Sequence, residues 1–160
     1  MSLASYFPAL ARRSFGVESA RPLAESGYAA VLFADLIGFT ALAESLSPRG
    51  PRGAEELSRI VDTHFGELTA MVLETGGDVL AFAGDAALAA WPADSEAELA
   101  AATVRAAHCA LRLQEAVARR AGASLLMRAS IGAGGLTHLR VGGAQGRWLF
   151  LAGGEAITAA

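Results

Sequence analysis

Two aspartates in this sequence stand out because each ends or interrupts an apolar run. Asp35 closes the run YAAVLFAD at residues 28–35, and Asp85 follows Gly84 in the middle of GGDVLAFAGDAALAAW at residues 76–91. A carboxylate that is buried without a partner is strongly destabilising, and two carboxylates that lie close repel each other unless a proton or a cation separates them. Mg²⁺ and Mn²⁺ prefer oxygen ligands and are typically held by one or two carboxylates and by substrate phosphates. If the fold brings them together, the two acids predict a divalent metal site.

The residues after Asp35 have the character of a phosphate-binding turn. The segment from Leu36 to Thr40 contains Gly38 and leads into a helical pattern. Free backbone N–H groups at a helix N-terminus bind phosphate, and a glycine there lets the chain approach a ligand closely. A strand, an acid, a turn and a helix, followed later by a hairpin acid, fit a two-metal triphosphate site. The structural alternative stays open, because an aspartate after a strand is commonly a helix cap and Gly-Asp is commonly a hairpin tip.

The elements that would position these residues are predicted from apolar periodicity and from turn residues. In chain order we expect a lead-in helix around 3–13, a strand at 28–35, a turn and helix at 36–46, a break at 47–53, an amphipathic helix at 54–74, strands at 78–83 and 86–91, a second long helix ending near 122, a strand at 124–135, a hairpin made of 136–143 and 147–154, and the start of a helix at 154–160. Gly84 and Asp85 suit the tight turn between the strands at 78–83 and 86–91. This order predicts an α+β fold, a ferredoxin-like sandwich with a mostly antiparallel sheet and helices on one face. In that fold the first strand and the hairpin lie side by side at the sheet centre, so Asp35 and Asp85 should converge.

The bulk composition restricts the function class. The chain has 160 residues, 53% hydrophobic and 18% charged, which is enough for one domain with a sizeable core. The net charge of −3 gives no basic field, so we expect no nucleic-acid partner. No apolar run approaches the ~20 residues needed to span a bilayer, and Arg12 and Arg13 follow the N-terminal apolar residues, the wrong order for a signal peptide. With Cys109 as the single cysteine, no internal disulfide can form, and we expect a cytoplasmic protein without a membrane partner.

Two segments, ADLIGFTALAE (34–44) and GGDVLAFAGDAALAAW (76–91), resemble the signature segments of the class III nucleotidyl cyclases. The resemblance runs from about Tyr28 to the end of the chain. The segment SPRGPRGAEELSRIVDTHF and the lead-in LASYFPALARR are most similar to the first cyclase half of bacterial tandem proteins that resemble the bicarbonate-responsive soluble adenylyl cyclases. The sequence pattern predicts a lead-in helix and linker at 1–27, and the resemblance implies a nucleotidyl cyclase-like domain at 28–160 that is incomplete at its C-terminus.

The resemblance implies a reaction and roles for individual residues. Asp35 and Asp85 match the two catalytic metal-binding aspartates, the carbonyl of Leu36 matches a backbone metal ligand, and the turn Ile37, Gly38, Phe39 and Thr40 matches the phosphate-binding loop. The family converts ATP or GTP to the cyclic nucleotide and pyrophosphate with two Mg²⁺ or Mn²⁺ ions. ATP is the expected substrate and GTP the alternative. The site forms at a dimer interface, so the implied partner is a second cyclase domain, either another copy or a later part of the same polypeptide.

Three departures from the family pattern bear on activity. Ala81 stands where the family often has a base-reading lysine, and Thr158 stands where an active half carries asparagine. The arginine that stabilises the transition state would come just after Ala160. The sequence thus keeps the metal and phosphate half of a site and lacks the other half, and we expect the isolated chain to have little or no activity.

Two other functions remain open from the sequence. One is a non-catalytic cyclase-like regulatory half that binds nucleotide or a partner cyclase domain, which the loss of lysine at Ala81 favours. The other is a ferredoxin-like domain with a structural role only. Among the remaining polar residues, His64 is predicted to pack against the core, while His138 and Arg140 are predicted to face solvent because they alternate with apolar residues.

Overall fold

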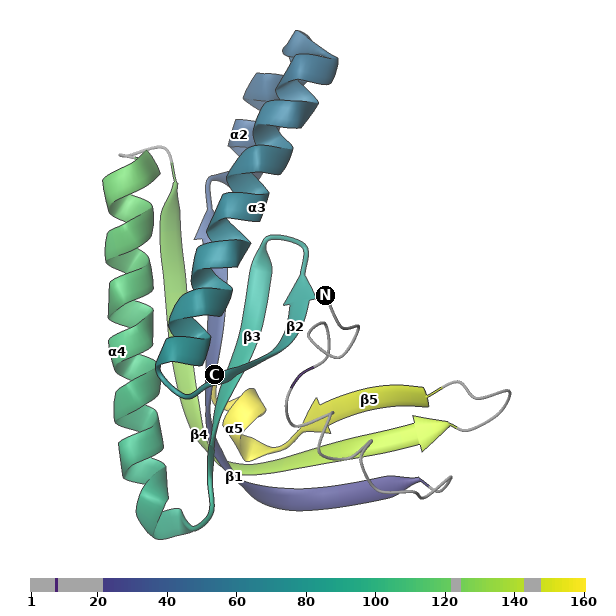
Figure 1. Cartoon of the computed structure of the whole chain (residues 1–160), viewed down its shortest axis with the longest axis vertical. Helices are drawn as coiled ribbons and strands as arrows, with labels where there is room; N and C mark the ends of the chain where they lie inside the picture. The colour runs from purple at the N-terminus through teal and green to yellow at the C-terminus, as the bar shows by residue number, and fades with distance from the viewer. Residues whose placement is uncertain (1–7, 9–21, 122–124, 143–147) are drawn as a thin grey trace.

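A computed structural model describes residue 8 and residues 22–121, 125–142 and 148–160 of the chain. Apart from residue 8, the predicted lead-in helix around 3–13 lies outside these residues. The elements, labelled in Figure 1, are β1 (Leu23–Ile37), α2 (Phe39–Leu46), the 3-10 turn η2 (Ser47–Arg49), α3 (Pro51–Glu74), β2 (Asp78–Ala83), β3 (Ala86–Ala93), α4 (Glu96–Ala121), β4 (Leu126–Gly142), β5 (Trp148–Gly153) and α5 (Glu155–Thr158).

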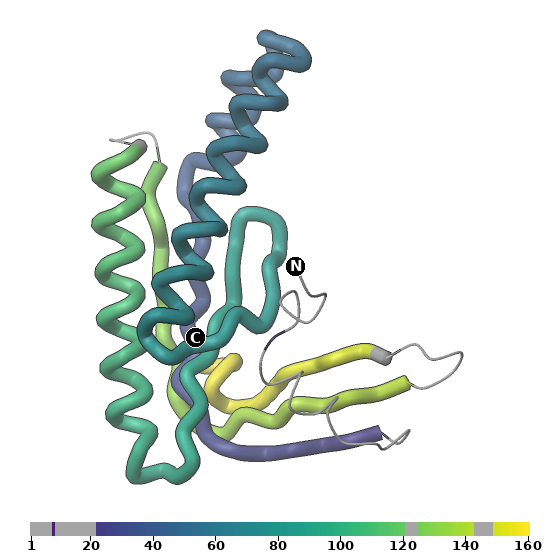
Figure 2. Tube along the Cα trace, in the orientation of Figure 1, coloured from purple at the N-terminus to yellow at the C-terminus, as the bar shows by residue number. Residues whose placement is uncertain are grey.

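The strands form one antiparallel five-stranded sheet in the order β2-β3-β1-β4-β5, with β1 at its centre. The sheet is strongly curled. Figures 1 and 2 show β1 and β4 bending, so that one end of each runs beside β3 and the other end runs out with β5. The predicted α+β fold with a mostly antiparallel sheet is confirmed, and the hairpin lies next to the first strand as expected.

The two faces of the sheet are covered differently. Alternate residues of β1 point to opposite faces: Ala30, Leu32, Ala34 and Leu36 join the large core beneath α3 and α4, whereas Ala29 and Val31 join a small cluster with Ala156 of α5. The predicted long helices therefore share one face. The short α5 lies on the other face, which we call the open face because α3 and α4 do not cover it.

Two glycines allow close contacts between backbone segments. A Cβ added to Gly53 would lie 2.0 Å from the Leu46 carbonyl oxygen, so the glycine lets the first turn of α3 pack against the end of α2. A Cβ at Gly132 would lie 2.2 Å from the Ala156 carbonyl oxygen, so this glycine of β4 lets α5 rest directly on the sheet.

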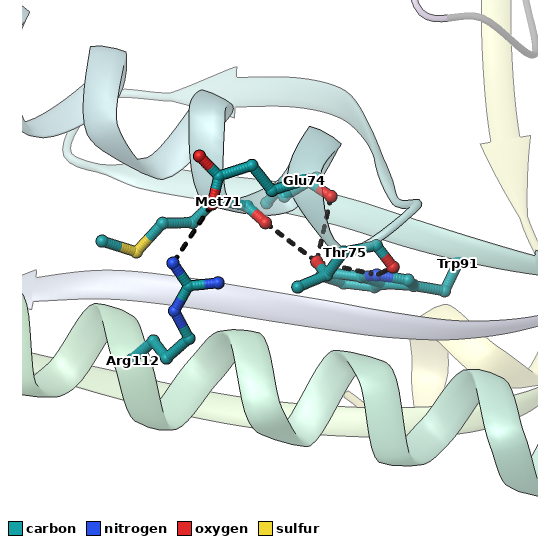
Figure 3. Close-up of polar contacts among 6 residues, drawn as sticks. Met71, Glu74, Thr75, Trp91 and Arg112 are labelled. Carbon is teal, nitrogen blue, oxygen red and sulfur yellow. Dashed lines mark hydrogen bonds and ion pairs between the residues drawn. The ribbon is translucent and has the colours of Figure 1, made fainter.

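Trp91 anchors the junction between α3 and the hairpin (Figure 3). Its side chain is fully buried, and its indole N–H donates to the carbonyl oxygen and the hydroxyl of Thr75, at 3.1 and 3.2 Å. The Thr75 hydroxyl in turn donates to the Met71 carbonyl at 2.9 Å, and Arg112 of α4 pairs with Glu74 at 3.1 Å. These contacts fix where the chain leaves α3 and so where β2 and β3 begin.

Several boundaries differ from the sequence prediction, among them the end of β1 at Ile37 rather than 35 and the end of β3 at Ala93 rather than 91. The first strand starts at Leu23 rather than 28, because residues 23–27 pair with the far end of β4 and need no β3 partner. The long helix starts at Pro51 rather than 54, since proline suits the first helical turn. The predicted strands 124–135 and 136–143 are one continuous strand, β4, because its glycines follow the bend of the sheet without breaking the pairing with β1.

The prediction for His138 and Arg140 is also wrong, while that for His64 is confirmed. Arg140 is buried, and the side chain of His138 is largely covered and lies 2.7 Å from a carboxylate oxygen of Glu25 on β1. Both residues are enclosed because β5 pairs with this part of β4. His64 is buried on α3 beside the ring of Phe65.

Candidate metal and triphosphate site

The strand register brings the two candidate acids to the same end of the sheet. Asp35, near the end of β1, pairs directly with Ala86, the first residue of β3. Asp85 immediately precedes Ala86 in the turn between β2 and β3. The hairpin turn, with Gly84 at φ 65°, therefore lies beside the end of β1, and this neighbourhood of the two acids is the one that the sequence predicted.

Asp35 has a cationic partner that the sequence analysis did not single out. Arg128 of β4 lies opposite Asp35 on the other side of β1, and its guanidinium donates to the Asp35 carboxylate at 2.6 Å. The Asp35 side chain is only 18% exposed, whereas that of Arg128 is 67% exposed. The sequence did contain a signal for this residue, because Arg128 is a charged residue within the apolar run LLMRASI, much as Asp35 is at the end of its own apolar run.

The predicted phosphate turn sits at the N-terminus of α2. β1 ends at Ile37, and Gly38 adopts a left-handed conformation, φ 93° and ψ −2°, as the residue that precedes Phe39 and Thr40 of the helix. This conformation strains any residue with a Cβ, which explains the glycine. No side chain caps the helix N-terminus, and its first turn holds no acidic residue. Its backbone N–H groups and the positive end of the helix dipole are thus available to an anion.

Leu36 contributes to the site only through its backbone. Its side chain is buried in the core under α3 and α4, on the face opposite to Asp35. The Leu36 carbonyl lies in the chain between Asp35 and the turn, where the resemblance expects a metal ligand.

The two altered positions lie on the same face of the sheet as Asp35. Ala81 of β2 pairs with Leu88, which packs in the open-face cluster, and cross-strand partners point to the same side. Ala81 is exposed and has no hydrogen-bonding group. Thr158 is on α5, where its hydroxyl donates to the Gly154 carbonyl at 3.0 Å. The fold therefore gathers Asp35, Arg128, Ala81 and Thr158 on the open face.

The donor set is small. Within residues 22–121, 125–142 and 148–160 no group of three or more histidine, cysteine, aspartate or glutamate side chains is placed to hold a metal ion. Asp35, Asp85 and the Leu36 carbonyl are all oxygen donors. They suit Mg²⁺ or Mn²⁺, which complete their shells with water and phosphate oxygens, and do not suit a closed structural metal site.

No helix in the described part of the chain is long and apolar enough to cross a membrane.

Comparisons with known proteins give a consistent result. No family model matches the chain. Over 142 residues, 86% of the chain, it is 34% identical to adenylate cyclase type 10 of Mus musculus, of whose length it spans only 9%. Among solved structures, the adenylyl cyclase CyaB from P. aeruginosa superimposes with a TM-score of 0.70 at 23% identity, covering 86% of this chain and 71% of that one. The guanylate cyclase domain of RhGC from Catenaria anguillulae, solved in complex with GTP, gives 0.62 at 21% identity, covering 84% and 71%.

Proposed function

Since the chain belongs to the class III nucleotidyl cyclase domains, we propose that it supplies the metal and phosphate half of a dimeric cyclase site. The reaction would convert ATP to cyclic AMP and pyrophosphate, with GTP as the alternative substrate. The proposal rests above all on the register that puts Asp35 opposite Ala86, beside the turn of Asp85.

The residues present fit two divalent cations. Asp35 and Asp85 would bind the ions, and the Leu36 carbonyl would add one neutral oxygen ligand. When bound, the ions would favour the attacking 3′ alkoxide and offset the charge of the triphosphate. Two carboxylates and a carbonyl leave most coordination positions to water and substrate, as Mg²⁺ requires.

The turn from Ile37 to Thr40 would bind the triphosphate through backbone N–H groups at the N-terminus of α2. Arg128 would assist from the other side of β1. In the absence of metal it neutralises Asp35, and once a cation takes that carboxylate the guanidinium, already at this end of the sheet, is free to bind phosphate oxygens.

A second cyclase domain would complete the site. Ala81 offers no donor to a base, and the Thr158 hydroxyl is already used within α5. The open face near the site carries exposed apolar side chains, among them Phe33, Ile37 and Leu126. Such a surface is typical of a protein interface. We therefore expect a partner domain on this face and little turnover by the chain alone.

The second candidate function is a non-catalytic regulatory half. It is favoured by the alanine at position 81 and by the Arg128–Asp35 ion pair, which would occupy a metal ligand permanently in a degenerate site. Such a module would bind a partner cyclase domain without supplying metal ligands to it.

Calorimetry of Mn²⁺-dependent ATP binding tests the proposal. We expect binding by the intact chain, loss of binding in Asp85→Ala, and unchanged binding in Asp62→Ala, which removes an exposed acid of α3. Adding a catalytically competent second half should then give cyclic nucleotide with the intact chain and not with Asp85→Ala. Turnover by the mixture that is insensitive to Asp85→Ala would favour the regulatory module instead.

A further inference from the structure

A separate cavity of about 350 Å³ lies on the helix side of the sheet, away from the open face. Its walls come from β1, α2, α3, α4 and the residue before β4. The lining residues are Leu36, Leu42, Arg59, Ile60, Thr63, His64, Val117, Arg120 and Leu125. The volume is in the range of small-molecule sites. Of the predicted metal ligands only Leu36 lines the cavity, and Asp35, Asp85 and the phosphate turn do not.

The polar part of the lining is cationic. Its charged groups are the guanidinium groups of Arg59 and Arg120; Thr63 and His64 are the other polar residues of the lining, and no carboxylate lines the cavity. Arg120 is paired with Glu67 of α3. Arg59 makes no ion pair with any residue that the structure describes. A guanidinium fork at the rim of a cavity suits a carboxylate, which it can bind with two parallel hydrogen bonds.

The imidazole of His64 adds a neutral hydrogen-bonding group. Burial lowers the pKa of His64, and the positive charge of Arg120 lowers it further. The lowered pKa favours the uncharged ring, and His64 makes no hydrogen bond to another side chain or to backbone within the described ranges. One ring N–H is available to an acceptor that enters the cavity.

The rest of the lining is aliphatic. Leu36, Val117 and Leu125 are buried, and Leu42 and Ile60 are partly buried. This floor would accept an apolar chain and gives no partner to a polyhydroxylated or multiply charged molecule. The lining thus joins an anion-binding rim to an apolar floor.

From this geometry we propose that the cavity binds a small amphipathic carboxylate, with its carboxylate on Arg59 and Arg120 and its aliphatic chain on the floor. The cavity adjoins the proposed active site through the chain itself, because Leu36 follows Asp35 and Leu42 lies on the helix that the phosphate turn begins. An occupant would therefore affect the position of α2. This second statement, unlike the binding itself, rests on the proposed function.

The test uses octanoate as the probe, with acetate and octylamine as controls that lack the chain or the negative charge. Binding is measured by calorimetry and by methyl NMR of the leucine, isoleucine and valine side chains. We expect octanoate to bind and to shift Leu42, Ile60 and Val117, and acetate and octylamine not to bind. Octyl phosphate binding in place of octanoate would overturn the assignment of a carboxylate.

Arg59→Ala should weaken octanoate binding about tenfold, the loss of one charge-assisted hydrogen bond. Arg105→Ala, which removes an exposed arginine of α4 that does not line the cavity, should leave it unchanged. Three outcomes would each overturn the proposal: no binding of octanoate, equal binding by the intact chain and Arg59→Ala, or NMR shifts confined to the open face.

Coupling is tested by repeating the Mn²⁺–ATP titration with saturating octanoate. We expect the ATP affinity to change, and a matching change of octanoate affinity with ATP, because linkage is reciprocal. If ATP does not bind at all, the proposed function fails while the octanoate result still stands. Binding of both ligands without any mutual effect would overturn the coupling alone.

Discussion

At the scale of single residues, Asp35 shows how a carboxylate is tolerated at the end of a buried strand. The sequence indicated a divalent cation as the neutralising partner. In the structure Arg128 supplies a positive charge at 2.6 Å. The two arrangements exclude each other at the same oxygen atom, so Arg128 is expected to compete with metal when no triphosphate is present.

Replacing Arg128 by methionine separates its two proposed roles, competition with the metal for Asp35 and binding of the triphosphate. We expect Arg128→Met to bind Mn²⁺ alone more tightly, because the competing guanidinium is gone. The same variant should bind Mn²⁺–ATP more weakly, by about one charge-assisted hydrogen bond, or roughly tenfold. Calorimetry of both titrations measures this. A parallel change of both affinities, in either direction, would contradict the assigned role.

His64 predicts a pH dependence of stability. Its pKa in the folded chain is lowered by burial and by Arg120 of α4, and Glu67 opposes this only partly. Arg59 adds a further positive charge to the same cavity. The unfolded chain therefore binds more protons than the folded chain just below the ordinary histidine pKa of about 6.5, and stability falls as the pH drops through that value.

The measurement is the free energy of unfolding in urea at pH 7.5 and 5.5, for the intact chain and for His64→Gln. We expect the intact chain to lose more stability between these values than the variant. His108 and His138 are present in both proteins, so their contributions cancel in the comparison. An identical loss in the two proteins would contradict a lowered pKa.

At the scale of elements, the hairpin that carries Asp85 is positioned by its contacts with α3. Phe82 of β2 packs edge-on against Phe65 of α3, with ring centroids 4.7 Å apart. Trp91 of β3 is held by Thr75 at the end of α3. Gly77, between α3 and β2, leaves room for the Trp91 ring, since a Cβ there would lie 2.6 Å from it.

Two glycine substitutions test this junction. Gly77→Ala forces the alanine methyl against the buried indole of Trp91 and should destabilise the fold by about 1–3 kcal/mol. Gly66→Ala, in the interior of α3 with open space around it, should instead stabilise the fold by about 0.5–1 kcal/mol. Urea unfolding measures both. Equal effects of the two substitutions would contradict the close packing at Gly77.

The extents of elements were predictable where a local signal marks them. Gly84 and Asp85 mark the hairpin turn, and the predicted strand 78–83 is the observed β2. The length of β4 was not predictable, because glycines within a sequence usually indicate the end of a strand. In β4 the pairing with β1 and the packing of α5 keep these glycines in a continuous strand.

At the scale of the whole molecule, the curled sheet has one face covered by long helices and one face largely open. Phe33, Ile37 and Leu126 are exposed on the open face beside the proposed metal site. Burying these side chains against a second domain would remove apolar surface from water at about 25 cal/mol per Å². This predicts association through the open face.

Sedimentation velocity over a range of concentrations tests the prediction. We expect the intact chain to self-associate and Phe33→Lys to weaken the association. Val104→Lys, which changes an exposed apolar residue of α4 on the covered side, should have no effect. A chain that stays monomeric throughout, or an equal effect of both substitutions, would count against the open face as the interface.

By itself, the sequence determined the order of elements from β1 to α4, the class of fold and the acids and turn that compose the candidate site. These follow from periodicity, glycine positions and motif spacing, all of which are local properties of the chain. Only the tertiary structure decided that Arg128 pairs with Asp35, that Ala81 and Thr158 share the open face, and that arginines of α3 and α4 line a cavity on the helix side of the sheet. Those relations join residues that are far apart in the sequence, and strand register and helix packing fix them after the local elements have formed.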